Sequence, residues 1–274
     1  MTPAGRLHTI SAPYRTANTN CSFMTYCLAI AVNEGLVFAS DSRTNAGVDQ
    51  VSHYGKMFTF SRDGDRQLVI LTAGNLATTQ AVINRIRKDL KDGAETNFHQ
   101  VESMSDAADY LGEIARDTQA KYGEAVTQAG FSAEVTFILG GQIGDTEPRI
   151  FLVYPQGNYI SSSEQTPFLQ LGEAKYGRPV LDRIITRETG LDEAARCALV
   201  SIDSTMRSNV SVGPPIELLR YESGSLRPGK YLCLEADDPY LSEIRRQWNL
   251  KLMQAFAELP HFSWTEVPQK PRFG

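Results

Sequence analysis

The residue best placed to do chemistry in this sequence is Thr25. It follows Met24 and directly precedes the apolar run Tyr26–Val32, whereas residues 1–22 are rich in Thr, Ser, Asn and Ala with little periodic apolar content. If that leader is removed, Thr25 begins the chain and carries both a hydroxyl nucleophile and an α-amine. An α-amine has an unperturbed pKa of about 7.7–8.0, so part of it is neutral near pH 7 and can accept the hydroxyl proton without any histidine.

An N-terminal nucleophile of this kind needs a nearby cation that favours the neutral amine, and a carboxylate that holds the cation. Asp41 ends the second apolar run and Lys56 begins the third. We therefore expect Thr25, Asp41 and Lys56 to meet at one end of the same sheet. Each residue also has an ordinary alternative: a threonine at a strand edge, an aspartate that caps a turn before Ser42, and a solvated lysine at a strand start.

Apolar periodicity predicts the elements that must position these residues. Short continuous apolar runs indicate buried strands, and apolar positions spaced by three or four residues indicate amphipathic helices. The expected order is strands at 25–32, 36–39, 56–60 and 67–72; helices at 75–91 and 103–122; strands at 133–141 and 149–154; helices at 174–187 and 191–207; strands at 216–221 and 231–234; and a helix at 239–258.

Regular strand–helix–strand alternation is missing from this order, which disfavours a doubly wound parallel sheet. Apolar strands buried on both faces, with helices in consecutive pairs, instead predict two stacked sheets covered by helix layers. We expect residues 1–24 to be a disordered leader or an over-long start, residues 25–260 to form one domain, and residues 261–274 to be an irregular tail. The last helix, 239–258, is expected to pack in the core or against another subunit.

Composition narrows the classes of function. The 274 residues carry 27 Lys+Arg and 32 Asp+Glu, a net charge of −5, and no basic cluster, which argues against a nucleic-acid partner. No apolar run approaches the roughly 20 residues of a membrane helix, and the first residues lack the apolar stretch of a secretory signal. The four cysteines form no C-x-x-C pair and are expected to be reduced thiols of a cytoplasmic protein. These cysteines are Cys21, Cys27, Cys197 and Cys233.

Common catalytic and cofactor motifs do not occur. The sequence has no phosphate-binding loop, no H-E-x-x-H, and no G-x-S-x-G; Ser211 comes close, but Asn209 stands where the first glycine would be. The four histidines are far apart and not at ligand spacing. We therefore expect no metal, no cofactor and no Ser-His-Asp triad.

Several short motifs occur in a recognisable order between about residues 24 and 250. They are Thr25; Ser40-Asp41-Ser42-Arg43; Gly55-Lys56; Thr72-Ala73-Gly74-Asn75 before a predicted helix; Leu171-Gly172-Glu173-Ala174-Lys175-Tyr176-Gly177; and the run from Ser201 to Gly213. In this order the chain resembles the β-subunit of the proteasome, and most closely the bacterial branch called Anbu, the ancestral beta subunit.

The resemblance implies an N-terminal-nucleophile hydrolase with an α+β fold, the four-layer αββα sandwich. Thr25 matches the nucleophile, and Asp41 and Lys56 match the acidic and basic partners of its amine and hydroxyl. Gly74 matches the residue whose backbone N–H binds the oxyanion, and Ser211 the serine near the threonine amine. The resemblance further implies a self-assembling homo-oligomer, either a ring or an open helical ring.

The sequence departs from the family pattern at several positions. Lys56 lies one residue closer to the threonine than in ordinary proteasome subunits. Glu173 stands where a Gly-Ser-Gly segment usually has its serine, and Ser208 where an aspartate is usual, with Asp203 the nearest acid upstream. Met24 occupies the place of the glycine that precedes the threonine in self-cleaving propeptides, which suggests that Met24 is the true initiator.

The sequence therefore predicts a cytoplasmic threonine-type peptidase that acts on a peptide or another amide. One alternative keeps the nucleophile but gives it a small-molecule substrate, as in an amidase or acylase. The other is a non-catalytic assembly subunit, which is disfavoured because Thr25, Asp41 and Lys56 occur together. The sequence identifies neither the natural substrate nor an ATPase partner.

Overall fold

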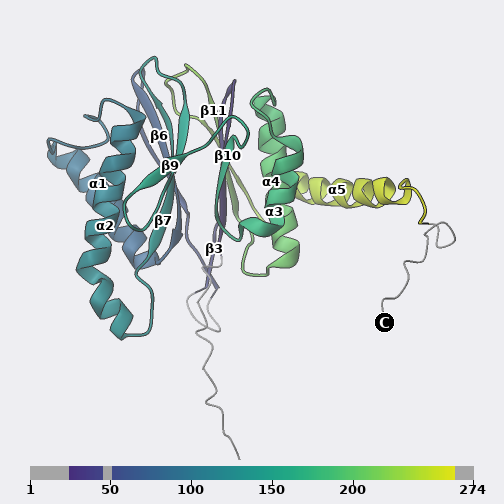
Figure 1. Ribbon diagram of the computed structural model, residues 1–274, viewed down its shortest axis with the longest axis horizontal. Helices are drawn as coiled ribbons and strands as arrows, with labels where there is room; N and C mark the ends of the chain where they lie inside the picture. The colour runs from purple at the N-terminus through teal and green to yellow at the C-terminus, as the bar shows by residue number, and fades with distance from the viewer. Residues whose placement is uncertain (1–24, 46–50, 263–274) are drawn as a thin grey trace, which may run out of the picture.

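The computed structural model describes residues 25–45 and 51–262, most of which form four layers (Figure 1). Two helices cover one face of a pair of stacked sheets, and two helices cover the other. The strands are β1 (Tyr26–Val32), β2 (Gly35–Asp41), β3 (Arg43–Asn45), β4 (Val51–His53), β5 (Met57–Arg62), β6 (Arg66–Gly74), β7 (Val135–Ile143), β8 (Arg149–Val153), β9 (Tyr159–Ser161), β10 (Phe168–Gly172), β11 (Ile216–Glu222) and β12 (Lys230–Leu234). The helices are α1 (Leu76–Asp92), α2 (Met104–Gln128), α3 (Ala174–Ile184), α4 (Leu191–Ser208) and α5 (Pro239–Ala257).

The two large sheets are antiparallel and have five strands each. The first runs β10-β1-β2-β11-β12, and the second runs β5-β6-β7-β8-β9. A separate two-stranded sheet joins β3 to β4. Helices α1 and α2 pack on the second sheet, and α3 and α4 pack on the first (Figure 1). This arrangement confirms the predicted αββα sandwich.

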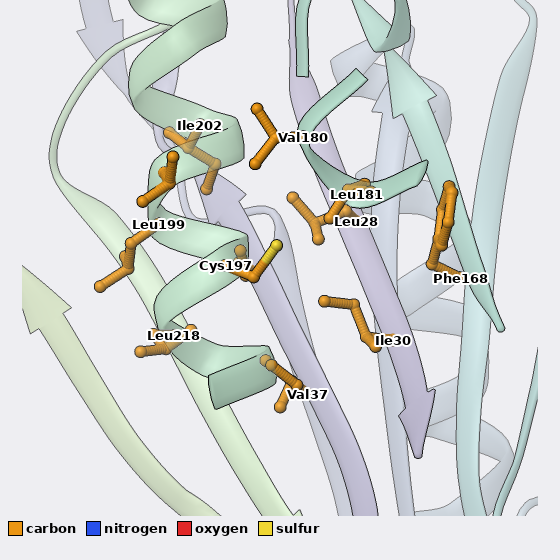
Figure 2. Packing of buried hydrophobic residues seen from close by; sticks show 14 of the residues in the cluster. Leu28, Ile30, Val37, Phe168, Val180, Leu181, Cys197, Leu199, Ile202 and Leu218 are labelled. Carbon is orange, nitrogen blue, oxygen red and sulfur yellow. The ribbon is translucent and has the colours of Figure 1, made fainter. Parts of the chain in front are cut away.

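Strand β1 shows why both faces of the first sheet are apolar. All seven of its residues are buried. Alternate side chains, among them Leu28 and Ile30, pack against α3 and α4 (Figure 2), whereas Cys27, Ala29 and Ala31 face the second sheet. A strand that is covered on both sides reads as a continuous apolar run because neither face meets water.

Small residues between the sheets make room for large ones. Gly140 of β7 lies under the ring of Phe38 from β2, and a Cβ at Gly140 would stand 2.6 Å from that ring. The inter-sheet core therefore depends on a missing side chain at this position, since interiors pack with few voids and little tolerance for added atoms.

The first two helices start where the sequence predicts. Asn75 caps α1 by accepting a hydrogen bond from the Thr78 N–H at 3.0 Å, and Ser103 begins α2 with a reciprocal bond to Asp106. Such caps satisfy backbone N–H groups that have no partner within the helix. The predicted helix at 174–187 is shorter in the structure, where α3 ends at Ile184.

Helix α5 lies apart from the other four helices (Figure 1). It extends away from α4, outside the four layers (Figure 1), and only Leu241 of its residues is buried. Ile244 and Trp248 are partly buried against the core that the first sheet forms with α3 and α4. Leu252 and Phe256 are 49% and 76% exposed. Of the two expectations for this helix, packing in the core therefore holds only for its first turns, and contact with another subunit stays a prediction.

The leader predicted at 1–24 lies outside the described residues, as do residues 263–274 of the predicted tail. Within the described ranges, each helix is too short or too polar to cross a membrane. Cys27, Cys197 and Cys233 are free thiols.

Candidate functional site

Thr25 lies directly before β1 and is buried. Its carbonyl oxygen accepts a hydrogen bond from the Glu173 N–H at 2.8 Å, at the junction of β10 and α3. Gly172 permits this close approach: its φ is +76°, and a Cβ there would stand 1.8 Å from the Thr25 carbonyl oxygen. A side chain at position 172 would displace residue 25, so the glycine fixes where the predicted nucleophile sits.

The predicted acid and base form a buried ion pair. Lys56 Nζ lies 2.6 Å from Asp41 Oδ1, and the two side chains are 8% and 0% exposed. The same Oδ1 accepts a hydrogen bond from the Tyr26 N–H at 3.0 Å. Because Tyr26 follows Thr25 in the chain, this bond ties the ion pair to the start of β1.

The pair joins the two sheets and does not lie on one. Asp41 ends β2 of the first sheet, whereas Lys56 directly precedes β5 of the second. The expectation that Thr25, Asp41 and Lys56 share one sheet is therefore wrong. Periodicity predicted the strands but gave no information on which strands pair, and the close contact arises because the sheets stack with these ends together.

Arg43 contributes two contacts to the same site. Its carbonyl oxygen accepts a second hydrogen bond from Lys56 Nζ, at 2.7 Å. Its guanidinium donates to the Val210 carbonyl oxygen and passes over Gly213, where a Cβ would stand 2.6 Å from Cζ. Arg43 thereby links the lysine to the loop after α4, a role that its place in a short motif did not reveal.

Burial dominates the electrostatics of the site. It raises the pKa of the Asp41 carboxyl, and the Lys56 ammonium and the N–H groups of Tyr26 and Gly213 oppose that shift. The buried thiol of Cys27, which donates to the Thr72 carbonyl oxygen at 3.6 Å, also has a raised pKa because of desolvation. A thiol is a nucleophile only as its thiolate, so Cys27 is unsuited to that role.

Gly74 is the last residue of β6 and stands just before α1. Its φ of +124° and the position of the Glu134 carbonyl oxygen, 2.4 Å from where a Cβ would be, leave room only for glycine. The Thr72 N–H donates to the Lys56 carbonyl oxygen at 3.1 Å, which brings the end of β6 beside the ion pair. The oxyanion-binding role of the Gly74 N–H stays a prediction.

Ser211 is buried in the loop after α4, and its N–H donates to Asn209 Oδ1 at 2.9 Å. Two residues further on, the Gly213 N–H points to Asp41 Oδ2 at 3.4 Å. The loop that carries Ser211 thus reaches the carboxylate of the ion pair, whereas any contact of its hydroxyl with the threonine amine stays a prediction.

Glu173 and Ser208, which depart from the family pattern, and Asp203, the nearest acid before Ser208, have separate surroundings. Glu173 stands at the start of α3, with Oε2 3.3 Å from Lys175 Nζ. Asp203 is buried in α4 and pairs with Arg245 of α5 at 2.8 Å, so it holds that helix to the body. Ser208, the last residue of α4, is exposed.

Sequence reasoning missed one buried carboxylate next to the ion pair. Glu217 of β11 accepts hydrogen bonds from the Lys56 backbone N–H and from the Ser40 hydroxyl. The only signal was a single acid inside the apolar run 216–219, a pattern also typical of a solvent-facing strand position. Within the described ranges, no cluster of three or more His, Cys, Asp or Glu side chains could hold a metal ion.

Comparisons with known proteins agree with this architecture. The model of the family Proteasome, "Proteasome subunit", matches residues 25–219. The chain is 42% identical to Anbu (ancestral beta-subunit) from Yersinia bercovieri, over 87% of this chain and 99% of that chain, with a TM-score of 0.82. It is 46% identical to a structure described as the helical assembly of the Anbu complex from Pseudomonas aeruginosa, over 89% and 100%, with a TM-score of 0.82.

A third structure, Anbu from Hyphomicrobium sp. strain MC1, is 40% identical over 87% of this chain and 100% of that chain, with a TM-score of 0.80. A search of curated protein sequences finds no match. The family model covers most of the chain, and the similar structures match over almost their whole length. The chain therefore belongs to the proteasome subunit family and is an Anbu-type member of it.

Proposed function

We propose that this protein is a threonine-type amide hydrolase whose nucleophile is the hydroxyl of an N-terminal Thr25. The observation that carries the proposal is the buried Lys56–Asp41 pair at 2.6 Å, tied through the Tyr26 N–H to the residue directly after Thr25. The family match, which begins at Thr25, supports the same choice. Buried charged groups beside a nucleophile such as the Thr25 hydroxyl are typical of catalytic sites.

The reaction follows from these groups. The Thr25 oxygen attacks the substrate carbonyl carbon, and the hydroxyl proton passes to the neutral α-amine. The Gly74 N–H stabilises the oxyanion, the protonated amine gives its proton to the leaving nitrogen, and an acyl-enzyme ester remains. Water then attacks the ester with the amine again as base, which releases the acid and restores Thr25. Lys56 tunes the amine, and Asp41 positions Lys56.

We propose two candidate classes of substrate for this reaction. A peptide substrate follows from the family. A smaller amide is the second candidate, because Glu173 and Ser208 replace two polar groups of the usual pattern, and here Glu173 pairs with Lys175 while Ser208 faces solvent.

We propose a homo-oligomer as the working form, since the Pseudomonas aeruginosa relative is described as a helical assembly. The exposed apolar side chains of α5 are consistent with a subunit contact. We propose the cytoplasm as the compartment, because three free thiols suit reducing conditions. A non-catalytic assembly subunit would have no use for the buried ion pair, which costs desolvation energy.

The test begins with the intact mass of the purified protein. The proposal requires a form that begins at Thr25, since only then is the amine free. That form should hydrolyse amides from a peptide library or an acyl-amide library, and the two libraries separate protease from amidase. Thr25→Ala should lose activity, whereas Thr25→Ser, which keeps a hydroxyl, should retain some. Unchanged hydrolysis by Thr25→Ala would place the reaction elsewhere.

A further inference from the structure

Glu217 is a buried carboxylate whose two oxygens are both occupied. The residue is 7% exposed. Oε2 accepts hydrogen bonds from the Lys56 backbone N–H at 3.0 Å and from the Ser40 hydroxyl at 3.1 Å. Oε1 accepts one from the Tyr231 hydroxyl at 2.9 Å. All three donors are neutral groups. Among these contacts, the buried charge of Glu217 is therefore compensated by hydrogen bonds and not by an ion pair.

These contacts reach both halves of the Lys56–Asp41 pair. Ser40 lies opposite Glu217 in the register of β2 with β11, and it directly precedes Asp41. Lys56 leads into β5 of the other sheet. One side chain therefore holds the backbone of Lys56 and the residue next to Asp41, and it does so across the gap between the two sheets.

The surroundings keep this carboxylate in place. At Gly55 an added Cβ would already meet Oε1 at 3.5 Å, so the backbone before Lys56 runs close against Glu217. Tyr231, whose hydroxyl donates to Oε1, lies on the edge strand β12. Burial and the negative charge of Glu217 raise the pKa of the Tyr231 hydroxyl, so it stays protonated and remains a donor.

We propose that Glu217 is a positioning residue that sets the distance between the Lys56 ammonium and the Asp41 carboxylate. A hydrogen bond to a charged group holds a backbone N–H more firmly than a neutral one does. Without it the segment at residues 55–56 is free to move away from the first sheet, and the ammonium moves with it. The kinetic consequence of this role rests on the function proposed above, but the backbone contact does not.

The test uses the full-length protein and three variants. Glu217→Leu removes every acceptor at similar volume, and Glu217→Gln keeps one oxygen and no charge. Glu222→Gln is the matched control, since Glu222 lies on the same strand but is exposed. The first readout is hydrogen exchange at the Lys56 amide, compared with the amides of β7. We expect exchange at Lys56 to rise about 10- to 100-fold in Glu217→Leu, less in Glu217→Gln, and not at all in Glu222→Gln.

The second readout is kinetic. For the form that begins at Thr25, kcat should fall in the order wild type, Glu217→Gln, Glu217→Leu, by about tenfold at each step, with KM within about twofold. A residue that merely stabilises the fold would lower the melting temperature without this separation of kcat from KM. Wild-type exchange at Lys56 together with wild-type kcat in Glu217→Leu would overturn the proposal.

A milder variant keeps the test decisive if Glu217→Leu does not fold. Tyr231→Phe removes one donor at a half-exposed position, and Lys56 exchange should then rise about threefold to tenfold. Unchanged exchange there and in Glu217→Gln would refute the positioning role. If the wild type hydrolyses no amide, the proposed function fails, yet faster exchange at Lys56 in the variants would still support the positioning of that residue.

Discussion

Removing one partner of the Lys56–Asp41 pair should be costly for stability as well as for activity. Lys56→Met keeps an unbranched side chain but removes the charge. The 2.6 Å distance and exposures of 8% and 0% place the pair away from water. At an effective dielectric constant of 20, Coulomb's law gives an attraction of about 6 kcal/mol at that distance. Withdrawing two ions from water costs several kcal/mol each, so most of the attraction is offset while both partners are present.

The single variants should expose that offset. We expect Lys56→Met to lower the free energy of unfolding by about 3 kcal/mol and Asp41→Asn by about 3–5 kcal/mol. Asp41→Asn costs more because the Tyr26 N–H, the Gly213 N–H and the Lys56 ammonium all donate to this side chain, and an amide offers only one oxygen. The double variant leaves no unpaired charge and should cost about 2–3 kcal/mol less than the sum of the two.

Urea unfolding followed by circular dichroism measures all four proteins. Protomer concentration must be the same throughout, because assembly stabilises the folded state by mass action. Two single effects that add to the double effect within about 0.5 kcal/mol would refute the reasoning, since additivity is the behaviour of residues that do not interact.

The stability of the wild type and of Lys56→Met should also depend on pH. An unfolded aspartate has a pKa of about 3.9, and burial raises the pKa of Asp41 in the folded state. Between these two values the folded state binds more protons than the unfolded state, so stability falls as pH rises through that interval. Lys56→Met lacks the opposing cation, so its urea midpoint should fall more steeply from pH 4 to pH 7 than that of the wild type. An equal slope in the two proteins would contradict this.

Three further variants test backbone strain at Gly74, with Gly123 as its control, and the attachment of α5. Gly74→Ala should lower the free energy of unfolding by about 2–3 kcal/mol, because a Cβ would stand 2.4 Å from the Glu134 carbonyl oxygen at a φ of +124°. The control Gly123→Ala, in open space within α2, should instead raise the free energy of unfolding by up to about 1 kcal/mol. Equal urea midpoints for these two variants would argue against strain at Gly74. Asp203→Asn breaks the ion pair with the half-exposed Arg245, so it should lower the free energy of unfolding by about 1–2 kcal/mol and speed hydrogen exchange in α5. Unchanged exchange in α5 would show that this ion pair does not hold the helix to the body.

The layer order could be predicted because burial leaves a direct trace in the sequence. Strands such as β1 and β2, covered on both faces, are continuous apolar runs, and α1 and α2 carry their apolar residues on one stripe. The short strands β3, β4 and β9 were missed because three residues are too few to show a period. Strand β10 was missed as well, because its sequence FLQLG mixes buried, half-buried and exposed positions.

Contacts between distant elements could not be predicted in the same way. Lys56 was expected on the sheet of Asp41, but periodicity says nothing about which strands become neighbours. Helix α5 has the apolar residues of a core helix, yet most of them are exposed, because an amphipathic pattern does not reveal what covers it. Glu217 went unnoticed because its three donors lie far from it in the sequence or on another sheet, and they become its neighbours only in the folded protein.

The most direct measurement is the site of covalent modification by a peptide epoxyketone, mapped by mass spectrometry on the form that begins at Thr25. This reagent requires a hydroxyl and a free α-amine on one residue. We expect one adduct per chain on Thr25, slower formation in Lys56→Met, and none in Thr25→Ala. An intact Thr25 after prolonged exposure, or an adduct that persists in Thr25→Ala, would contradict the account of this threonine as the nucleophile.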